Sequence, residues 1–159
     1  MYWANFLHLY QPPVQERWIV EKVADECYRK LVRILRENPG GRLTLNINGS
    51  LTEQFYHYGM HDILDGLREL AEEGRIEFTG SAMYHPILPL IPEEEVRRQI
   101  RLNQEINREY LGEAFQPRGF FPPEMCYNRR VAEIVKEEGF FWIIADEISY
   151  NGRLAWIAP

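Results

Sequence analysis

Short apolar segments alternate with longer amphipathic segments along the chain, and this alternation constrains the fold more than any other feature of the sequence. The apolar segments have the length and composition of buried strands, at residues 3–9, 43–47, 76–79, 119–121 and 141–145. The amphipathic segments between them are predicted helices, at residues 16–37, 61–73, 92–111 and 129–138. The resulting order, β-α-β-α-β-α-β-α-β, predicts an α/β fold with one parallel sheet, because parallel strands need long crossovers to connect them.

Glycine and proline set the boundaries of these predicted elements. The first helix ends at residues 38–41, which read Asn-Pro-Gly-Gly, and Pro92 opens the third helix ahead of three glutamates. Residues 48–50 are predicted to be a loop, with Ser50 or Thr52 capping the next element, and residues 154–157 are a candidate sixth strand. The predicted core stripe of the first helix is Ile19, Val20, Val23, Cys27, Leu31, Ile34 and Leu35.

Charge and composition exclude several classes of protein. The chain has 159 residues, a formal net charge of −6 and 13% aromatic residues. An acidic chain is a poor nucleic-acid binder, and no apolar run approaches the roughly 18 residues of a membrane span. The apolar start is too short for a signal peptide, and two cysteines form no disulfide framework, so we expect a cytoplasmic protein.

Polar and aromatic side chains follow each predicted strand. Since the carboxyl ends of parallel strands meet at one end of the sheet, where ligands bind in α/β folds, these residues should lie together. They are His8, Tyr10, Gln11, Asn46, Asn48, Thr52, Glu53, Ser81, Tyr84, His85, Glu124, Cys126, Tyr127, Asn128, Asp146 and Glu147.

Three segments carry the pattern of a known enzyme family. Residues 8–12 read His-Leu-Tyr-Gln-Pro, residues 84–89 read Tyr-His-Pro-Ile-Leu-Pro, and residues 121–124 read Phe-Pro-Pro-Glu. On these segments the chain resembles glycoside hydrolase family 57, retaining enzymes that act on α-glucans, over essentially its whole length. The sequence departs from the family at Tyr10, where the family's first motif usually has a histidine.

The resemblance implies a role for each of these residues. Glu124 matches the catalytic nucleophile, and an apolar strand followed by two prolines would give it the fixed aim that a nucleophile needs. A nucleophile must be charged, so a cationic or hydrogen-bonding neighbour such as Arg129 or a histidine is expected. The expected substrate is an α-glucan or oligosaccharide, and no metal or other cofactor is expected. The expected substrate-binding residues are His8, Tyr10, Gln11, His85, Tyr127, Asp146 and Glu147.

The length sets a problem for this interpretation. Retaining hydrolysis needs two carboxyl groups, and the family's acid/base is an aspartate on a later strand of a seven-stranded barrel. The chain supplies about five β-α units, so residues 1–159 are expected to be the N-terminal portion of a (β/α)7 catalytic domain that hydrolyses nothing alone. With the full barrel present, the enzyme would be a glycosidase, a 4-α-glucanotransferase or a branching enzyme.

We favour the interpretation that the chain is a fragment of a longer enzyme. Two other interpretations stay open, a half-barrel that pairs with a second copy of itself and an acid/base role taken over by another residue. Two copies of a half-barrel could associate through their open sheet edges. Alternatively, Asp146 or Glu147 could have taken over as the acid/base.

The candidate residues can also be interpreted as purely structural, or as part of a different kind of site. Glu124 could be a helix-capping residue for the helix at 129–138, and strand aromatics such as Phe121 and Trp142 are more often core than sugar platforms. Two alternative functions stay open, a non-catalytic half-barrel binding module and a metal-dependent carbohydrate deacetylase-like hydrolase. For the hydrolase, His57 and His61 have the i, i+4 spacing of metal ligands on a helix. No acidic pair follows the first strand, which weakens that alternative.

Overall fold

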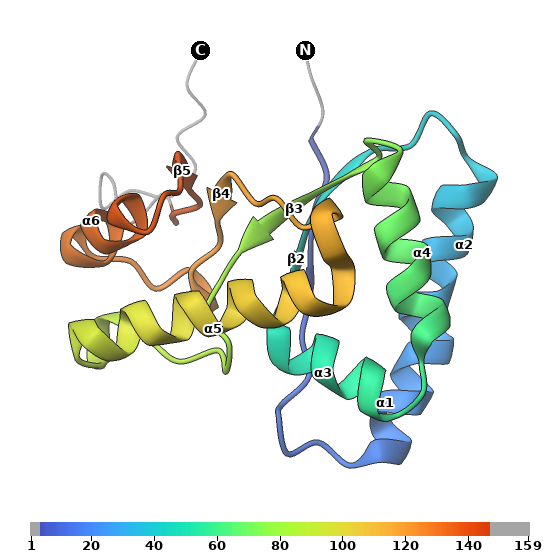
Figure 1. Cartoon of the computed structure of the whole chain (residues 1–159), viewed down its shortest axis with the longest axis horizontal. Helices are drawn as coiled ribbons and strands as arrows, with labels where there is room; N and C mark the ends of the chain where they lie inside the picture. Colours follow the sequence, from blue (N-terminus) through green and yellow to red (C-terminus); the bar gives the residue numbers. More distant parts are fainter. Residues whose placement is uncertain (1–3, 147–159) are drawn as a thin grey trace.

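Five parallel strands form a single sheet in the computed structural model, which describes residues 4–146 (Figure 1). The strands are β1 (Phe6–Leu9), β2 (Leu43–Ile47), β3 (Ile76–Gly80), β4 (Gly119–Phe120) and β5 (Trp142–Ile143). They lie side by side in chain order, so the sheet has no point at which the strand order reverses. This order is that of a barrel wall rather than of a doubly wound sheet, and it confirms the predicted α/β fold with parallel strands. The candidate strand at residues 154–157 lies outside the described residues.

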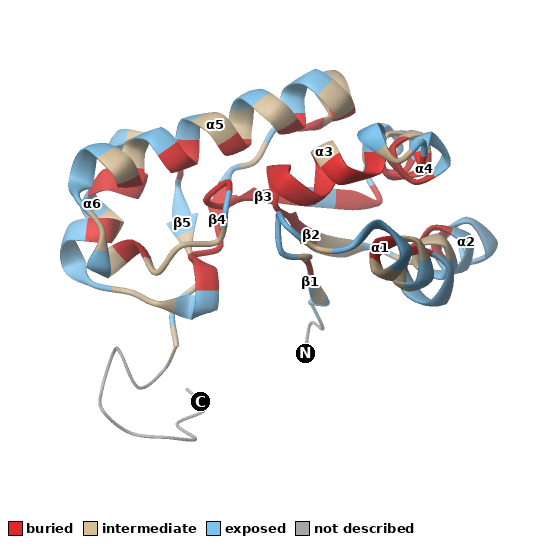
Figure 2. Ribbon diagram, turned by 90° about the horizontal axis from the view of Figure 1, so that it is seen from below, coloured by how far each residue is buried: buried red, intermediate tan, exposed pale blue. Residues whose placement is uncertain are grey.

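Helices connect successive strands and surround the sheet on its outer side (Figure 2). They are α1 (Arg17–Val23), α2 (Arg29–Glu37), α3 (Gly49–His57), α4 (His61–Glu72), α5 (Glu93–Leu111) and α6 (Arg129–Glu137). A π-helical segment, η1 (Ala24–Tyr28), joins α1 to α2, and three short 3-10 turns are η2 (Leu88–Leu90), η3 (Gly112–Ala114) and η4 (Pro123–Met125). No helix among the described residues is both long and apolar enough to span a membrane.

The helix α3 corrects the predicted loop at residues 48–50. It begins at Gly49, directly after β2, with Asn48 at the N-cap position, and Ser50 and Thr52 lie inside it rather than capping it. The sequence gives no amphipathic stripe here because α3 is buried on more than one side. Its buried residues are Gly49, Ser50, Leu51, Thr52, Gln54 and Phe55.

The π-helical segment also changes which side of the first helix faces the core. Ile34 is 53% exposed and Cys27 is exposed, so the prediction that both lie in the core is wrong. The wider π-helical turn shifts the phase of the helix, so that buried residues recur every four positions from Val20 to Val32. The buried residues are Val20, Ala24, Tyr28, Val32 and Leu35.

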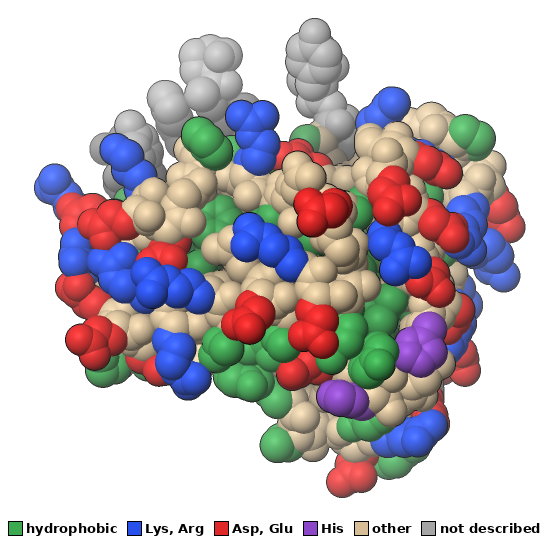
Figure 3. All heavy atoms as spheres, in the orientation of Figure 1, with side chains coloured by type: hydrophobic (Ala, Val, Ile, Leu, Met, Phe, Trp, Pro, Cys, Tyr) green, Lys and Arg blue, Asp and Glu red, His purple; other side chains and the backbone are tan. Residues whose placement is uncertain are grey.

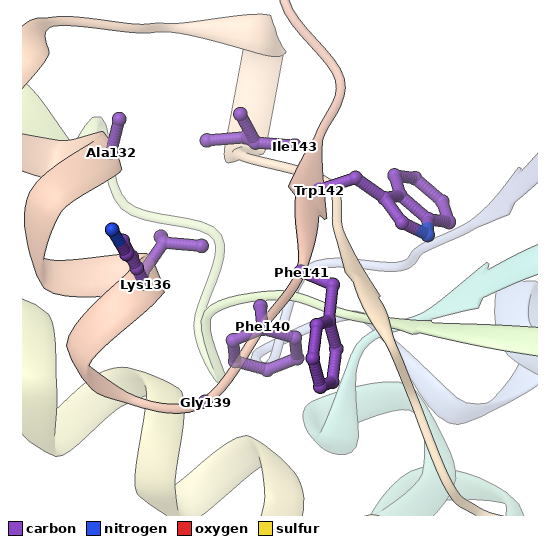
Figure 4. A pocket seen from close by; sticks show the side chains of 8 residues that line it. Ala132, Lys136, Gly139, Phe140, Phe141, Trp142 and Ile143 are labelled. Atoms are coloured by element: carbon purple, nitrogen blue, oxygen red, sulfur yellow. The ribbon is translucent and has the colours of Figure 1, made fainter.

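Alternation along the strands separates an outer face, against the helices, from an inner face. Phe120 packs on the outer face, while its neighbour Gly119 has its inner side covered by the indole of Trp142. Figure 4 shows the Trp142 and Ile143 side chains on opposite sides of β5. The strand register places one inner-face residue of each strand in a row across the sheet, in the order His8, Asn46, Thr79, Gly119 and Trp142.

Ion pairs hold α6, the helix that follows the Glu124 loop, against α5. Arg101 Nη2 lies 2.8 Å from Glu138 Oε1, and Arg130 Nη2 lies 2.5 Å from Glu93 Oε2. These pairs are exposed or only partly buried, so each contributes little alone, but together they connect the two helices along their lengths.

Candidate active site

Three aromatic rings, from β1, the loop after it and the loop after β3, stack at the carboxyl end of the sheet. The centroid of the His85 ring lies 4.2 Å from that of Tyr10 and 5.2 Å from that of His8. The His8 ring also packs on Phe121, at 5.0 Å between centroids. The structure therefore brings together His8 and Tyr10, which belong to the first motif, with His85 of the second.

Glu124 completes this cluster from the loop after β4. Its Oε1 atom lies 3.6 Å from Nδ1 of His85. The two side chains differ sharply in environment, because that of His85 is 7% exposed and that of Glu124 is 64% exposed. The carboxylate thus lies at the surface, with the imidazole packed beneath it.

Backbone strain is concentrated at these residues. Among the described residues, the non-glycine residues with positive φ are His85, Glu124 and Met125, at 57°, 56° and 51°. Each such conformation costs on the order of 1–3 kcal/mol and persists only where the surroundings enforce it. For Glu124 the enforcing elements are the two prolines before it and the hydrogen bond from Met125 N to Pro122 O, 2.9 Å long. The backbone that carries the Glu124 side chain is thus held in one conformation by a stiff turn.

Two kinds of neighbour were expected for Glu124, and the structure places a histidine, His85, beside it rather than Arg129. Arg129 points to Glu133, with Nε 3.3 Å from Oε1, and its side chain is exposed. Glu124 does not cap the following helix either, because the Asn128 side chain accepts the hydrogen bond from Val131 N at the start of α6. The capping interpretation of Glu124 is therefore wrong.

A buried asparagine that was not predicted to bind substrate fixes the orientation of His8. Asn46 Nδ2 donates to Thr79 Oγ1 at 3.0 Å and to Gly80 O at 3.4 Å. Since a backbone carbonyl can only accept, this contact turns Asn46 Oδ1 toward His8, whose Nδ1 lies 2.7 Å away. The proton of a neutral His8 must then be on Nδ1, which leaves Nε2 as an acceptor.

Burial favours the neutral form of both imidazoles. Burial lowers the pKa of His85, and the neighbouring His8 lowers it further, while the Glu124 charge acts in the opposite direction. Burial also lowers the pKa of His8, against the hydrogen bond to Asn46 and the charge of Glu124. Two neutral rings side by side can accept or donate single hydrogen bonds without repelling one another.

These shifts predict a loss of stability in mild acid. An unfolded histidine takes up its proton near its ordinary pKa of 6.5, whereas both folded rings require a lower pH. Between the folded and unfolded pKa values the unfolded state binds more protons than the folded state. The contribution of these rings to the free energy of unfolding is therefore complete above pH 6.5 and decreases as the pH falls through this window. Urea unfolding at pH 7.5 and at pH 5.5 measures the difference in free energy of unfolding. This difference should be smaller in His85→Asn, and asparagine is chosen because it tolerates the positive φ of position 85.

Carboxyl groups cannot produce the same effect in this window. A hydrogen bond from Arg29 lowers the pKa of Asp62, and one from Arg101 lowers the pKa of Glu138. The stabilisation that these carboxylates give to the folded state is therefore lost only as the pH falls through these lowered pKa values, far below the window of the histidines. An unchanged pH difference in His85→Asn would contradict the assignment to this ring.

The remaining predicted residues lie around the cluster rather than in it. Gln11 is engaged by η1 and by its own loop, because its Nε2 donates to Tyr28 Oη at 3.2 Å and its Oε1 accepts from Gln15. Tyr127 and Asp146 are half-buried, and among the described residues the Tyr127 ring does not stack on His8, Tyr10 or His85. Glu147 lies outside the described residues.

The alternative metal site is not assembled as the spacing suggested. His57 ends α3 and His61 begins α4, and Gly59 between them has a φ of 78° that breaks the helix. The two histidines therefore do not share one helical face. Within residues 4–146 no group of three or more histidine, cysteine, aspartate or glutamate side chains is placed to hold a metal ion.

An apolar pocket of about 390 Å³ lies elsewhere, between α6 and the β5 edge of the sheet (Figure 4). It is lined by Ala132, Val135, Lys136, Phe140, Phe141 and Ile143, among others. None of the predicted site residues lines it, so the candidate site is the ring cluster at Glu124.

Comparison with known proteins identifies related sequences and structures. Residues 4–159 match the sequence model of glycosyl hydrolase family 57. An α-amylase of Pyrococcus horikoshii is 27% identical over 149 residues, which are 92% of this chain and 23% of that protein. The chain thus spans about a quarter of the length of the curated relatives it matches first.

Two solved structures extend the comparison. The 4-α-glucanotransferase of Thermococcus litoralis is 26% identical and superposes with a TM-score of 0.85, covering 92% of this chain and 23% of that one. A family 4 carbohydrate esterase from Streptomyces lividans is 15% identical with a TM-score of 0.63, covering 95% of this chain and 67% of that one. The second likeness concerns the fold alone.

Proposed function

The chain belongs to glycosyl hydrolase family 57, and from this we propose that it forms part of a retaining enzyme that acts on α-glucans, with Glu124 as the nucleophile. The single observation that carries the assignment is the geometry of Glu124, a carboxylate on a strained, proline-stiffened turn, 3.6 Å from a buried imidazole. The sequence relatives include α-amylases and 4-α-glucanotransferases, which supports an α-glucan as substrate.

In the proposed reaction a Glu124 oxygen attacks the anomeric carbon of the bound glucosyl unit. The bond to the leaving oxygen breaks as a glucosyl ester of Glu124 forms, and the leaving oxygen takes a proton from an acid. Water, or a hydroxyl group of a second sugar, then attacks the ester with the same group acting as base. The first acceptor gives hydrolysis and the second gives glucanotransfer.

The second carboxyl group is proposed to lie outside these 159 residues. Residues 1–159 would then be the N-terminal part of a seven-stranded barrel, and further strands, rather than a second copy, would pair with β1 and β5, the outer strands of the described sheet. The alternatives, Asp146 and Glu147, follow β5 in the chain. Both stay proposed as substrate-binding residues, as does Tyr127.

The stacked rings are proposed to orient the sugar next to Glu124. His8 Nε2 is the acceptor left by the contact with Asn46, and Tyr10 and His85 offer a stacked aromatic surface. His85 Nε2 is buried without a partner among the described residues, so the ring proton is better placed on Nδ1, toward Glu124. Gln11, held by Tyr28 and Gln15, would position the loop that carries Tyr10.

The chain is therefore expected to bind maltooligosaccharides weakly and to cleave none of them. Isothermal titration with maltotriose measures the binding, and anion-exchange chromatography of products after long incubation measures the cleavage. Glu124→Gln removes a charge but no binding surface, so it should bind maltotriose within about threefold of the unsubstituted chain. Sustained turnover by these 159 residues would contradict the proposed location of the acid/base outside them.

A further inference from the structure

The loop at residues 10–15, between β1 and α1, carries Tyr10 to its place on the His85 ring. Residues 12 and 13 are both prolines, which have no backbone N–H group to donate. Figures 1 and 3 show the loop at the lower edge of the molecule, and Val14 near its tip is 92% exposed. The shape of this loop therefore depends on side chains that reach it from other elements.

Tyr28 reaches this loop from the π-helical segment η1. Its hydroxyl group uses both of its hydrogen-bonding roles there, because it donates to Tyr10 O at 3.4 Å and accepts from Gln11 Nε2 at 3.2 Å. The Tyr28 ring is buried and meets that of Phe55 in α3 edge to face, with centroids 5.3 Å apart. The wider turn of η1 keeps Tyr28 on the buried side of its helix, and such turns occur often at functional sites.

A second side chain, that of Gln54 in α3, holds the middle of the same loop. Its Nε2 atom donates to the carbonyls of Pro12 and Pro13, at 2.8 and 3.3 Å. Gln54 is adjacent to Phe55, on which Tyr28 packs, so both side chains reach the loop from one packed part of the core. Together they bind three backbone carbonyls of the loop, which limits the conformations open to it.

The loop connects these contacts to the candidate active site. Tyr10, whose carbonyl Tyr28 binds, stacks on His85 at 4.2 Å between ring centroids, and His85 Nδ1 lies 3.6 Å from Glu124 Oε1. We propose that Tyr28 and Gln54 are positioning residues of the active site, which hold the Tyr10 ring in the stack beside Glu124. They act through the loop rather than by touching the substrate, and their role in catalysis rests on the function proposed above for Glu124.

Tyr28→Phe tests this role, because it keeps the ring and removes both hydrogen bonds of the hydroxyl group. The measurement is the nuclear magnetic resonance of the His85 ring protons, whose chemical shifts respond to the aromatic ring stacked on them. Tyr10→Ala, which removes that ring, gives the shifts of an unstacked His85. In Tyr28→Phe the shifts should move toward those of Tyr10→Ala, and the dissociation constant for maltotriose should rise roughly three- to tenfold. Gln54→Met removes the other donor at similar length and should act in the same direction, with a larger effect in the double variant.

Leu70→Val controls for a simple loss of stability. It removes one methylene group from a buried residue of α4, close to where that helix leads into β3 at the amino end of the sheet, so it should destabilise the chain without moving the His85 shifts. Unchanged shifts in both Tyr28→Phe and Gln54→Met, or equal changes in Leu70→Val, would overturn the positioning role. If the unsubstituted chain binds no maltotriose, the function proposed for Glu124 is contradicted, while the His85 shifts still decide whether Tyr28 and Gln54 position the Tyr10 ring.

Discussion

Replacement of Glu124 by glutamine is expected to lower kcat on maltooligosaccharides by a factor on the order of 10⁴, in the complete enzyme that the proposed function implies. Glutamine keeps the shape and the strained turn but cannot form the glucosyl ester, so the loss reports on covalent catalysis rather than on folding. KM should change little, because the substituted side chain still fills its place beside His85. Steady-state kinetics on maltotriose and longer oligosaccharides provide both constants.

Two companion variants make this result specific. Glu124→Asp keeps the charge but withdraws it by one methylene group, so it should retain more activity than glutamine and much less than the unsubstituted enzyme. Glu105→Gln changes an exposed carboxylate on α5 and should leave kcat unchanged. If Glu124→Gln keeps more than about a tenth of the activity, another residue is the nucleophile.

Mass spectrometry provides an independent test of the same assignment. A slow substrate that accumulates the covalent intermediate should add one glucosyl mass to the peptide that contains Glu124. The adduct should be absent from Glu124→Gln and present in Glu105→Gln. An adduct on a different peptide would contradict the proposed role directly.

The sequence predicted the ends of the strands better than the conformation of the residues that follow them. Apolar strands bounded by glycine and proline indicated the sheet and placed His8, His85 and Glu124 at one end of it, as the structure has them. The positive φ of His85 and Glu124 was beyond such reasoning, because positive φ is uncommon for any residue other than glycine, even though histidine adopts it more often than most. Only the tertiary contacts and the adjacent prolines impose it.

Helix prediction failed where burial is not one-sided. Periodicity identifies a helix by the contrast between an apolar and a polar face, and α3 has buried polar residues such as Asn48 and Gln54 at and after its start. In the first helix the period itself changes at η1, and Ile34 turns outward as a result. Both errors arise from packing and hydrogen bonding between elements, which a single-sequence pattern does not contain.

Asn46 illustrates a residue whose role depends on a network. The sequence does contain a signal, a polar side chain inside the buried strand at residues 43–47, since such a side chain must find partners. Its partners, however, come from β1 and β3, and their identity follows only from the strand register that aligns His8, Asn46 and Thr79.

Asn46→Leu is expected to move the proton of neutral His8 from Nδ1 to Nε2. The free energy of unfolding should also fall by about 1–3 kcal/mol, because the substitution leaves the polar partners of Asn46 without a hydrogen bond. Long-range ¹H–¹⁵N spectra of the imidazole ring distinguish the two tautomers, with His8 assigned through a His8→Gln variant. Maltotriose binding should weaken, since Nε2 would change from acceptor to donor on the side facing the sugar.

Two further variants distinguish the tautomer effect from simple destabilisation. Thr79→Val removes one partner of the Asn46 amide but keeps the Gly80 carbonyl that orients it, so His8 should keep its proton on Nδ1 despite a loss of stability. Asn46→Asp keeps the acceptor and adds a negative charge, which should raise the pKa of His8 and shift the pH dependence of maltotriose binding upward. If His8 carries its proton on Nε2 in the unsubstituted chain, the Asn46 amide does not set the tautomer, and the acceptor role proposed for Nε2 is lost with it.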